Sequence, residues 1–313
     1  MKIVVVGAGA IGGYVAARML EAGLDVTLLV RERRKRQLEA SGLKLFSSLG
    51  DYSGHPPLLV SGEAGGPFDL AVIATKAYGL PEIIHQLRPY LHKRTAILPL
   101  LNGMKHMEQL IEAFPGQPML GGVARIEITL DESGVIRHLG SHHSFTYGRF
   151  HPCSDEGYAN AQRILSGVPV FKEKIDIEQD MWEKYAFITV LSGLTTLFQA
   201  PVGAIRETSA GMETFRRAFN ETHEVIKRAN GRLGSGLMDK QLATVSGMSP
   251  KSTSSMLRDM TNGLPTESAH IHGYLVELAR RHDCDIPLLE LIHQRLEIYE
   301  KTRLDASAQE LTL

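Results

Sequence analysis

The chain has 313 residues, enough for two domains of about 150 residues each, and 43% of them are hydrophobic, as in a globular protein. Its formal net charge of −1 gives no reason to expect a nucleic-acid partner, and its two cysteines are too few for a disulfide framework, so we expect a protein of the reducing cytoplasm. The most apolar stretch, residues 186–198, is shorter than the roughly 20 residues that cross a bilayer, so we expect no membrane span.

A short apolar run at residues 3–6 opens the chain, and Gly7, Gly9 and Gly12 follow it. The run is too short for a helix and is typical of a buried strand, while the glycines have the spacing G-x-G-x-x-G. A helical pattern then continues to Gly23. A strand, a glycine-rich turn and a helix N-terminus in this order predict a dinucleotide-binding site, with cofactor-binding residues Gly7, Ala8, Gly9, Ala10, Ile11 and Gly12.

Strands and helices alternate along the first half, which predicts a parallel sheet covered on both faces. We expect further strands at 25–30, 69–75 and 95–101, helices at 31–42 and 80–91, and a hairpin-like excursion formed by 42–48 and 56–62. An antiparallel meander at 119–147, a helix at 154–167 and a strand at 169–173 complete this half, and only helices follow, at 175–198, 210–231, 249–263, 265–283 and 286–301. The expected fold is therefore α/β, a Rossmann-type doubly wound sheet in residues 1–172 followed by an all-α domain in residues 173–313.

The end of the second predicted strand carries Arg31, where NAD-binding versions of this unit have Asp or Glu. Residues 32–36 (ERRKR) follow, so cations crowd the first turn of the next helix and oppose its dipole unless an anion binds there. The 2′-phosphate of NADPH would be that anion, with Arg31 as its ligand, while Lys35 and Arg36 are interpreted as a solvated basic face.

Two more polar residues follow predicted strands, at the edge where open α/β sheets bind their ligands. Lys76 comes after the strand at 69–75, and Asn102 comes after the strand at 95–101. Their position beside a nucleotide crevice favours a functional role over surface decoration.

The order of these motifs along nearly the whole chain resembles that of ketopantoate reductases. The matching features are G-A-G-A-I-G-G at 7–13, Arg31, T-K-A at 75–77, N-G-M at 102–104, W-E-K at 182–184, and S-S-M-L at 254–257 followed by Glu267. The resemblance implies a Rossmann domain joined to a helical domain, and NADPH-dependent reduction of a 2-keto acid, of the type that converts 2-dehydropantoate to pantoate in pantothenate biosynthesis.

The same resemblance implies roles for individual residues. Lys184 resembles the catalytic lysine, Asn102 the residue between nicotinamide and substrate, Ser255 a substrate ligand, and Glu267 a cofactor-side carboxylate with a part in catalysis. Chemistry supports the lysine, because hydride delivery to a ketone builds negative charge on the oxygen and a lysine can donate a proton there.

The sequence departs from the family pattern where asparagines would follow the catalytic lysine. Those places hold Ile188, Ser192 and Val202. Because residues four apart share a helix face, Lys184, Ile188 and Ser192 are expected to line one side of the substrate pocket. The pocket is then less polar, so the hydroxyl-bearing tail of ketopantoate need not be the tail that it holds.

Three functions stay open at this point. The leading one is a ketopantoate-type reductase, and the others are a 2-hydroxy acid dehydrogenase for an apolar branched or aromatic acid and a non-catalytic NADPH-binding regulator. Lys184, Asn102, Ser255 and Glu267 favour an enzyme, because a sensor would need only the N-terminal half. We expect no metal site, since no histidine pair has ligand spacing beside carboxylates, and a homodimer is the open candidate for a protein partner.

Overall fold

The chain folds into two compact units. The computed structural model describes residues 1–150 and 153–310, with the side chains of 141–142 and 306–310 outside the description. One unit, here the sheet unit, comprises Met1–Asn102 and His106–Glu178, and the other, the helical unit, comprises Gly103–Lys105 and Gln179–Leu313. The division at Glu178 lies beyond the expected boundary at 172, because the strand Phe171–Glu173 pairs with the sheet unit and the next helix begins there.

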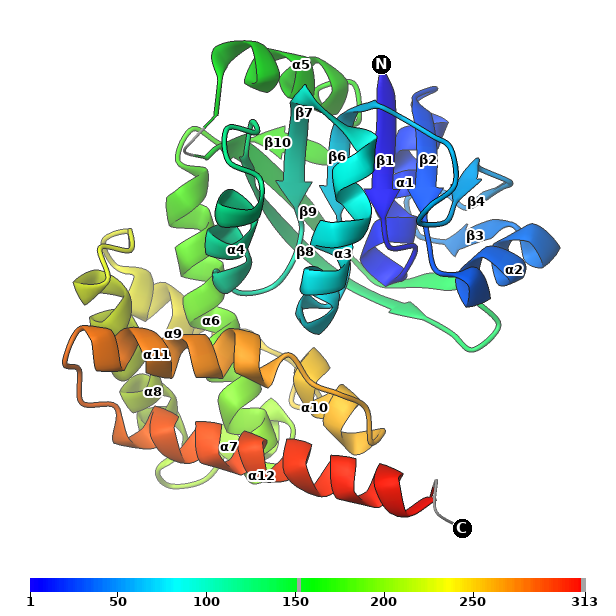
Figure 1. The fold of residues 1–313 in the computed structure, drawn as a ribbon. Helices are drawn as coiled ribbons and strands as arrows, with labels where there is room; N and C mark the ends of the chain where they lie inside the picture. The colour runs from blue at the N-terminus through cyan, green and yellow to red at the C-terminus, as the bar shows by residue number, and fades with distance from the viewer. Residues whose placement is uncertain (151–152, 311–313) are drawn as a thin grey trace. The chain divides into compact units, whose positions relative to one another are not determined.

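A parallel five-stranded sheet forms the centre of the sheet unit, in the order β5-β2-β1-β6-β7 (Figure 1). Its strands are β1 (Lys2–Val6), β2 (Asp25–Leu29), β5 (Leu58–Leu59), β6 (Phe68–Ile73) and β7 (Leu91–Pro99), and each neighbouring pair is parallel. The connecting helices are α1 (Ala10–Glu21), α2 (Glu32–Ser41), α3 (Leu80–Leu87) and α4 (Lys105–Ala113), with short 3₁₀ turns at Ala77–Gly79 and Arg88–Tyr90. Parallel strands buried on both faces explain the unbroken apolar run of β1, in which Ile3, Val4, Val5 and Val6 are fully buried.

A second sheet, in the order β10-β9-β3-β4 with β8 paired to β9, packs against α1. It consists of β3 (Leu43–Phe46), β4 (Tyr52–Gly54), β8 (Leu120–Leu130), β9 (Ile136–Arg149) and β10 (Phe171–Glu173), and α5 (Asp155–Leu165) connects β9 to β10. The long β8–β9 hairpin confirms the expected meander. α1 lies so close to β9 that a Cβ on Gly13 would come within 2.3 Å of Ile136 Cδ1.

The expected hairpin of residues 42–48 with 56–62 is wrong in its partner. β3 pairs with β4, whereas β5 joins the parallel sheet beside β2, with Leu28 opposite Leu58. Pairing with β2 leaves Leu59 only 4% exposed and extends the parallel sheet by one strand. Burial of Leu59, with Leu58 half-buried beside it, favours this pairing over the one suggested by proximity along the chain.

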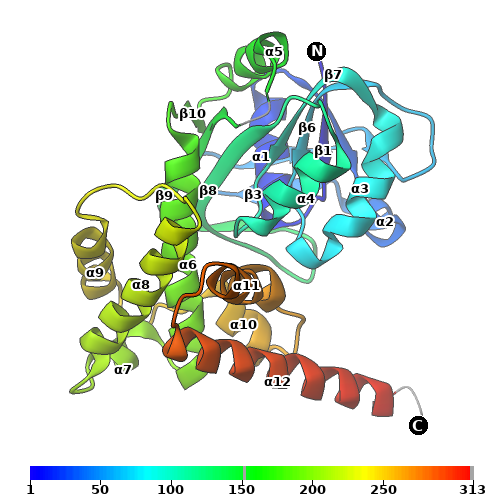
Figure 2. The ribbon, with the colours of Figure 1, turned by 60° about the vertical axis from the view of Figure 1, so that its left-hand side comes forward.

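The helical unit contains no strand within the part of the chain that the structure describes, which matches the expected all-α domain (Figure 2). Its elements are α6 (Ile177–Phe198), which begins just before the division, α7 (Val202–Arg206), α8 (Gly211–Arg228), α9 (Leu237–Gly247), α10 (Ser255–Thr261), the π-helix η3 (Ala269–Gly273), α11 (Tyr274–Arg281) and α12 (Pro287–Glu310). The sequence reading did not assign α7 or α9. Among the described residues, none of the helices has the length and hydropathy needed to span a bilayer.

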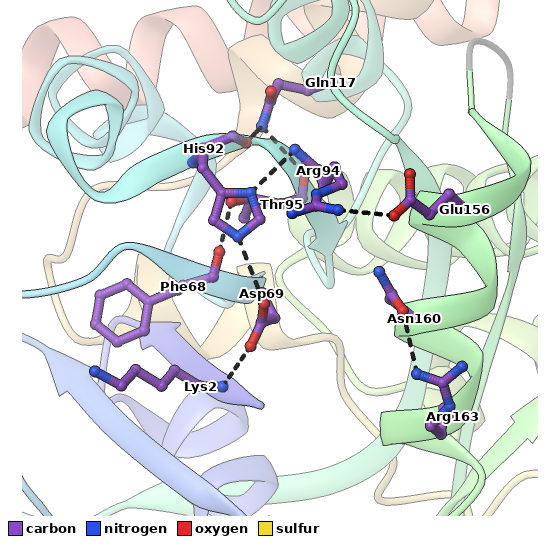
Figure 3. Close-up of polar contacts among 10 residues, drawn as sticks. All are labelled: Lys2, Phe68, Asp69, His92, Arg94, Thr95, Gln117, Glu156, Asn160 and Arg163. Atoms are coloured by element: carbon purple, nitrogen blue, oxygen red, sulfur yellow. Dashed lines mark hydrogen bonds and ion pairs between the residues drawn. The ribbon is translucent and has the colours of Figure 1, made fainter.

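Polar side chains tie the amino ends of the parallel strands to one another (Figure 3). Asp69 accepts a hydrogen bond from the Lys2 backbone N–H at 2.7 Å, and Thr95 Oγ1 donates to the Phe68 carbonyl at 2.5 Å. Gln117 Nε2 donates to the carbonyls of His92 and Thr95 at 3.2 and 3.1 Å. These contacts join groups of the sheet unit to one another at the amino edge of the sheet, and the candidate site lies at the opposite, carboxyl edge.

Candidate functional site

The turn between β1 and α1, residues 7–12 and here called the glycine turn, brings backbone against backbone. Gly7 has φ +90°, a conformation that L side chains rarely adopt, and its N–H donates to the Leu29 carbonyl of β2 at 3.0 Å. A Cβ on Gly12 would come within 1.8 Å of the Gly7 carbonyl oxygen. Only glycine fits these two positions, because the helix starts directly on the end of the strand.

Gly9 differs from Gly7 and Gly12, since a Cβ on Gly9 would meet no atom within 4 Å. It is the N-cap of α1, and no side chain caps that helix end. The first N–H groups of α1, at Ala10 and Ile11, lie at the positive end of the helix dipole, next to the open space at Gly9. A dinucleotide pyrophosphate fits this arrangement, which offers donors, positive potential and no side chain in the way.

The cationic side chains at the end of β2 and the start of α2 are bound by partners that the sequence did not reveal. Arg31, the N-cap of α2, forms an ion pair with Glu82 in the first turn of α3. Arg34 donates from Nε to the Ala8 carbonyl at 3.0 Å and from its other nitrogens to the Gly134 carbonyl at 3.3 Å. Burial lowers the pKa of Arg34, which braces the glycine turn from inside the unit.

Lys35, expected with Arg36 on a solvated basic face, forms an ion pair at the surface. Its Nζ lies 2.6 Å from Glu63 Oε1, and that carboxylate also accepts a hydrogen bond from the Val60 backbone at 2.8 Å. Arg36 is exposed, as expected. A carboxylate brought from a later strand connection thus neutralises Lys35, a partnership that spacing along the helix could not indicate.

Lys76 and Asn102 lie at the same edge of the parallel sheet as the glycine turn. Lys76 directly precedes the 3₁₀ turn after β6 and is exposed, and Asn102 follows β7 and is half-buried. Because β1, β2, β6 and β7 run parallel, Arg31, the glycine turn, Lys76 and Asn102 all follow carboxyl ends of strands. The structure therefore brings the predicted cofactor residues of the sheet unit to one edge.

In the helical unit, Lys184 and Ile188 lie one turn apart on α6, and both are half-buried. Ser192, a further turn along, is 5% exposed and donates its hydroxyl proton to the Ile188 carbonyl at 2.6 Å. With its proton engaged in the helix, Ser192 can only accept a hydrogen bond from a ligand. Of the expected stripe, Lys184 and Ile188 are the more accessible members.

Two hydrogen bonds tie α6 to the π-helix that follows Glu267. Tyr185 donates its hydroxyl to the Ile271 carbonyl at 2.7 Å, and His272 Nε2 lies 3.0 Å from the Thr189 carbonyl. Burial lowers the pKa of His272 to about 4, so its ring is neutral at pH 7 and Nε2 carries the proton that it donates. The segments that carry Lys184 and Glu267 are thereby fixed to each other.

Glu267 itself is 7% exposed, and its backbone carbonyl accepts the N–H groups of His270 and Ile271, both at 3.0 Å. The preceding Thr266 is held by Glu300 of α12, which accepts from the Thr266 backbone at 2.7 Å and from its hydroxyl at 2.6 Å. π-Helical turns inside helices are frequent at functional sites. The element that positions Glu267 was not visible in the sequence, because a π-turn has no simple spacing signal.

The two serines of S-S-M-L have different surroundings. Ser254 is the N-cap of α10, accepts the Leu257 N–H at 3.0 Å and shares a 2.7 Å hydrogen bond with Thr195 Oγ1 of α6. Ser255 is exposed at the start of the helix, so the geometry leaves it, and not its neighbour, accessible to a ligand. Val202 is fully buried, so its place in the family pattern is a packing position in this chain.

Within the part of the chain that the structure describes, no group of three or more His, Cys, Asp or Glu residues is placed to hold a metal ion. Both cysteines are free thiols, and burial raises the pKa of each thiol. Neither cysteine is adjacent to the glycine turn or to Lys184 in the sequence.

Comparison with known families gives two matches that together span most of the chain. The family model described as Ketopantoate reductase PanE/ApbA matches residues 3–152. The one described as Ketopantoate reductase PanE/ApbA C terminal matches residues 176–300. Their order and bounds follow the sheet unit and the helical unit.

Individual relatives are similar over nearly their whole length. The chain is 41% identical over 303 residues to a Bacillus subtilis protein named Uncharacterized oxidoreductase YkpB, covering 96% of this chain and 99% of that one. It is 25% identical over 304 residues to a 2-dehydropantoate 2-reductase of Halobacterium salinarum, covering 96% and 99% of the two chains.

Solved structures give the same picture of the fold. The 2-dehydropantoate 2-reductase of Geobacter metallireducens superposes with a TM-score of 0.84 at 27% identity, covering 95% of this chain and 99% of that one. A D-mandelate dehydrogenase solved with NADH and anilino(oxo)acetate superposes with a TM-score of 0.85 at 20% identity, covering 97% and 99%. At 20% identity, the similarity to the D-mandelate dehydrogenase shows a shared fold and nothing more.

The contrast between Gly12 and Gly9 gives a matched pair of variants. Gly12→Ala forces a methyl group onto the Gly7 carbonyl, so we expect a loss of about 3 kcal/mol in the free energy of unfolding. Gly9→Ala meets open space and should change stability by less than about 0.5 kcal/mol, yet weaken NADPH binding at least about tenfold, because the methyl group occupies the approach of the pyrophosphate. Thermal unfolding and fluorescence titration measure the two effects, and wild-type stability in Gly12→Ala would contradict the assignment.

Proposed function

Because this chain belongs to the ketopantoate reductase family, we propose that it reduces a 2-keto acid to a 2-hydroxy acid with NADPH as the hydride donor. The observation that carries the proposal is the combination of an unobstructed glycine turn with a half-buried Lys184 whose helix is fixed to the segment of Glu267. The family supports oxidoreductase chemistry, and the D-mandelate dehydrogenase neighbour supports a wider range of acids than ketopantoate.

For the cofactor, we propose NADP over NAD. Arg31 supports this choice, since a guanidinium at the end of β2 suits a 2′-phosphate and the acidic residue typical of NAD sites is absent from that position. The pyrophosphate would lie on the N-terminus of α1, with Lys76 and Asn102 at the neighbouring strand ends. When bound, the nicotinamide supplies the hydride, and the glycine turn supplies backbone donors and room.

Lys184 has the catalytic role in this proposal. Its ammonium group stabilises the negative charge that develops on the keto oxygen and donates a proton to that oxygen as the hydroxyl forms. Asn102 orients the reacting groups, Ser255 donates a hydrogen bond from its hydroxyl to the substrate carboxylate, and Glu267 acts from the cofactor side. The partial burial of Lys184 suits this task, because desolvation makes a lysine readier to give up its proton.

For the substrate, we propose a 2-keto acid with an apolar branched or aromatic tail, which the enzyme would reduce at least as efficiently as ketopantoate. Ile188, one turn after Lys184 and half-buried, presents a branched apolar side chain where the family pattern has an amide. An apolar site offers no hydrogen bond to the ketopantoate hydroxyl. It discriminates only weakly between substrate tails of different length, by roughly 1–3 kcal/mol per methylene. A non-catalytic NADPH-binding regulator is the remaining alternative, and turnover of any 2-keto acid would exclude it.

We also propose a cytoplasmic homodimer, formed through α12. A groove of about 560 Å³ is lined by Leu197, Phe198, Thr214, Arg217, Pro287, Leu288 and Leu291. Phe198, Leu291 and, seven residues further along α12, Ile298 are each about half exposed. A twofold axis would let the apolar side chains of one α12 fill the groove at the start of the other, since isologous contacts need a self-complementary surface.

Lys184→Ala should lower turnover by about a hundredfold or more, the usual scale for loss of a positioned acid. NADPH affinity should stay nearly unchanged, because the glycine turn belongs to the sheet unit. Steady-state rates with a panel of 2-keto acids and fluorescence titration with NADPH measure both quantities, and Lys240→Ala, at an exposed lysine of α9, serves as the control. Wild-type turnover in Lys184→Ala would mean that another group supplies the proton.

Ile188→Asn should shift the ratio of kcat/KM toward ketopantoate and away from 2-ketoisovalerate and benzoylformate, by roughly 1–3 kcal/mol, because an amide can pair with the ketopantoate hydroxyl. Ile188→Val keeps the apolar character and should keep the wild-type order of substrates. Strong wild-type selectivity for ketopantoate over 2-ketoisovalerate would argue that Ile188 does not face the substrate tail.

Leu291→Glu should convert the dimer to a monomer, because it places a charge in the apolar contact. Leu139→Glu alters a leucine of similar exposure on β9 of the sheet unit and should leave the dimer intact. Light scattering after size exclusion gives the mass of each variant, and a monomeric wild-type protein would remove the dimer from the proposal.

A further inference from the structure

The Arg31–Glu82 ion pair crosses the end of the strand that leads into the glycine turn. Arg31 follows β2 and Glu82 belongs to α3, which follows β6, and in the sheet β2 and β6 flank β1 (Figure 1). The guanidinium lies over the 3₁₀ turn before α3, where a Cβ on Gly79 would come within 3.9 Å of an Arg31 nitrogen. Gln86, one turn further along α3, donates to the other Glu82 oxygen at 2.8 Å.

From this geometry we infer that Glu82 is a specificity-determining residue, which competes with the 2′-phosphate of NADPH for Arg31 and so limits the preference for NADPH over NADH. The inference rests on the proposed dinucleotide site. Arginine recognises carboxylate and phosphate through the same fork of N–H donors. A carboxylate that already occupies this fork must be displaced before a 2′-phosphate can be bound.

Charge and exposure set the size of this competition. The Arg31 and Glu82 side chains are 67% and 50% exposed, so the pair is screened by water and a dianionic phosphate can displace the carboxylate. Displacement is still opposed twice, since the pair must break and Glu82 then lies close to the arriving negative charge. NADH has no 2′-phosphate, so it leaves the pair intact and meets neither cost.

Two neighbouring cations of the same turn are already engaged elsewhere, whereas Arg33 and Arg36 are exposed. Lys35 is paired with Glu63, and Arg34 is bound to the carbonyls of Ala8 and Gly134. Glu82 neutralises the positive charge of Arg31, and Lys35 and Arg34, held by their own partners, do not readily supply another cation for the 2′-phosphate. Competition from Glu82 would therefore limit how strongly this strand end favours a cofactor with a 2′-phosphate.

The test uses the full-length protein and two probes that differ only in the 2′-phosphate, namely 2′,5′-ADP and 5′-AMP. Calorimetric titration at low ionic strength compares the wild type, Glu82→Gln and Glu156→Gln. Glu82→Gln should tighten 2′,5′-ADP binding about three- to tenfold and change 5′-AMP binding by less than about twofold. Glu156→Gln removes an exposed carboxylate from its ion pair with Arg94, at the amino edge of the sheet and away from the cations that follow β2, so it should leave both affinities within about twofold.

A second comparison tests whether Glu82 acts through Arg31. In an Arg31→Ala background, Glu82→Gln should tighten 2′,5′-ADP binding by less than about twofold, since the competition has been removed. Unchanged 2′,5′-ADP binding in Glu82→Gln, or equal tightening of 5′-AMP, would overturn the inference and leave the proposed function standing. Failure of the wild type to bind either probe or NADPH would overturn the proposed function, and the inference with it.

Discussion

Backbone packed against backbone at the start of α1 is the contact from which the sheet unit is built. Gly12 rests on the Gly7 carbonyl with no room for a methyl group, and Gly7 holds β2 through the Leu29 carbonyl. This contact fixes the direction of α1, which in turn is the surface on which the second sheet packs, through Gly13 and Ile136. Moving α1 outward by the width of a side chain would open the core between the two sheets, so the stability of the sheet unit and the proposed anion site depend on the same few atoms.

The helical unit depends on a different kind of constraint, hydrogen bonds made by buried side chains to backbone carbonyls. Tyr185 and His272 connect α6 and the π-helix in both directions, and Glu300 holds the residue before Glu267. These contacts are long-range in sequence and directional, so they fix the spacing of Lys184 and Glu267 more closely than apolar packing alone would. Hydrogen bonds made by other side chains thus fix the positions of the segments that carry Lys184 and Glu267.

Sequence patterns predicted the elements whose burial is periodic and missed the contacts that depend on the folded chain. The apolar runs of β1, β2, β6 and β7 and the long α6 were all predicted, because continuous or helical burial leaves a direct trace in the sequence. The partner of β3 was predicted wrongly, since local spacing does not say which sheet a two-residue strand will join. Glu82 and Glu63 could not be found at all, because they meet Arg31 and Lys35 from segments 51 and 28 residues away.

Three residues of the first half, Gly103–Lys105, belong to the helical unit, where Lys105 pairs with Glu277 at 3.0 Å and Gly103 lies against His270. The helical unit is therefore not a contiguous length of polypeptide. A gene fragment that begins at residue 179 would encode every helix after the division but leave Glu277 without its lysine and the His270 surface uncovered. Any cut of the chain between its two halves would therefore separate residues that fold together, so the helical unit should be produced with residues 103–105 if its native contacts are to form.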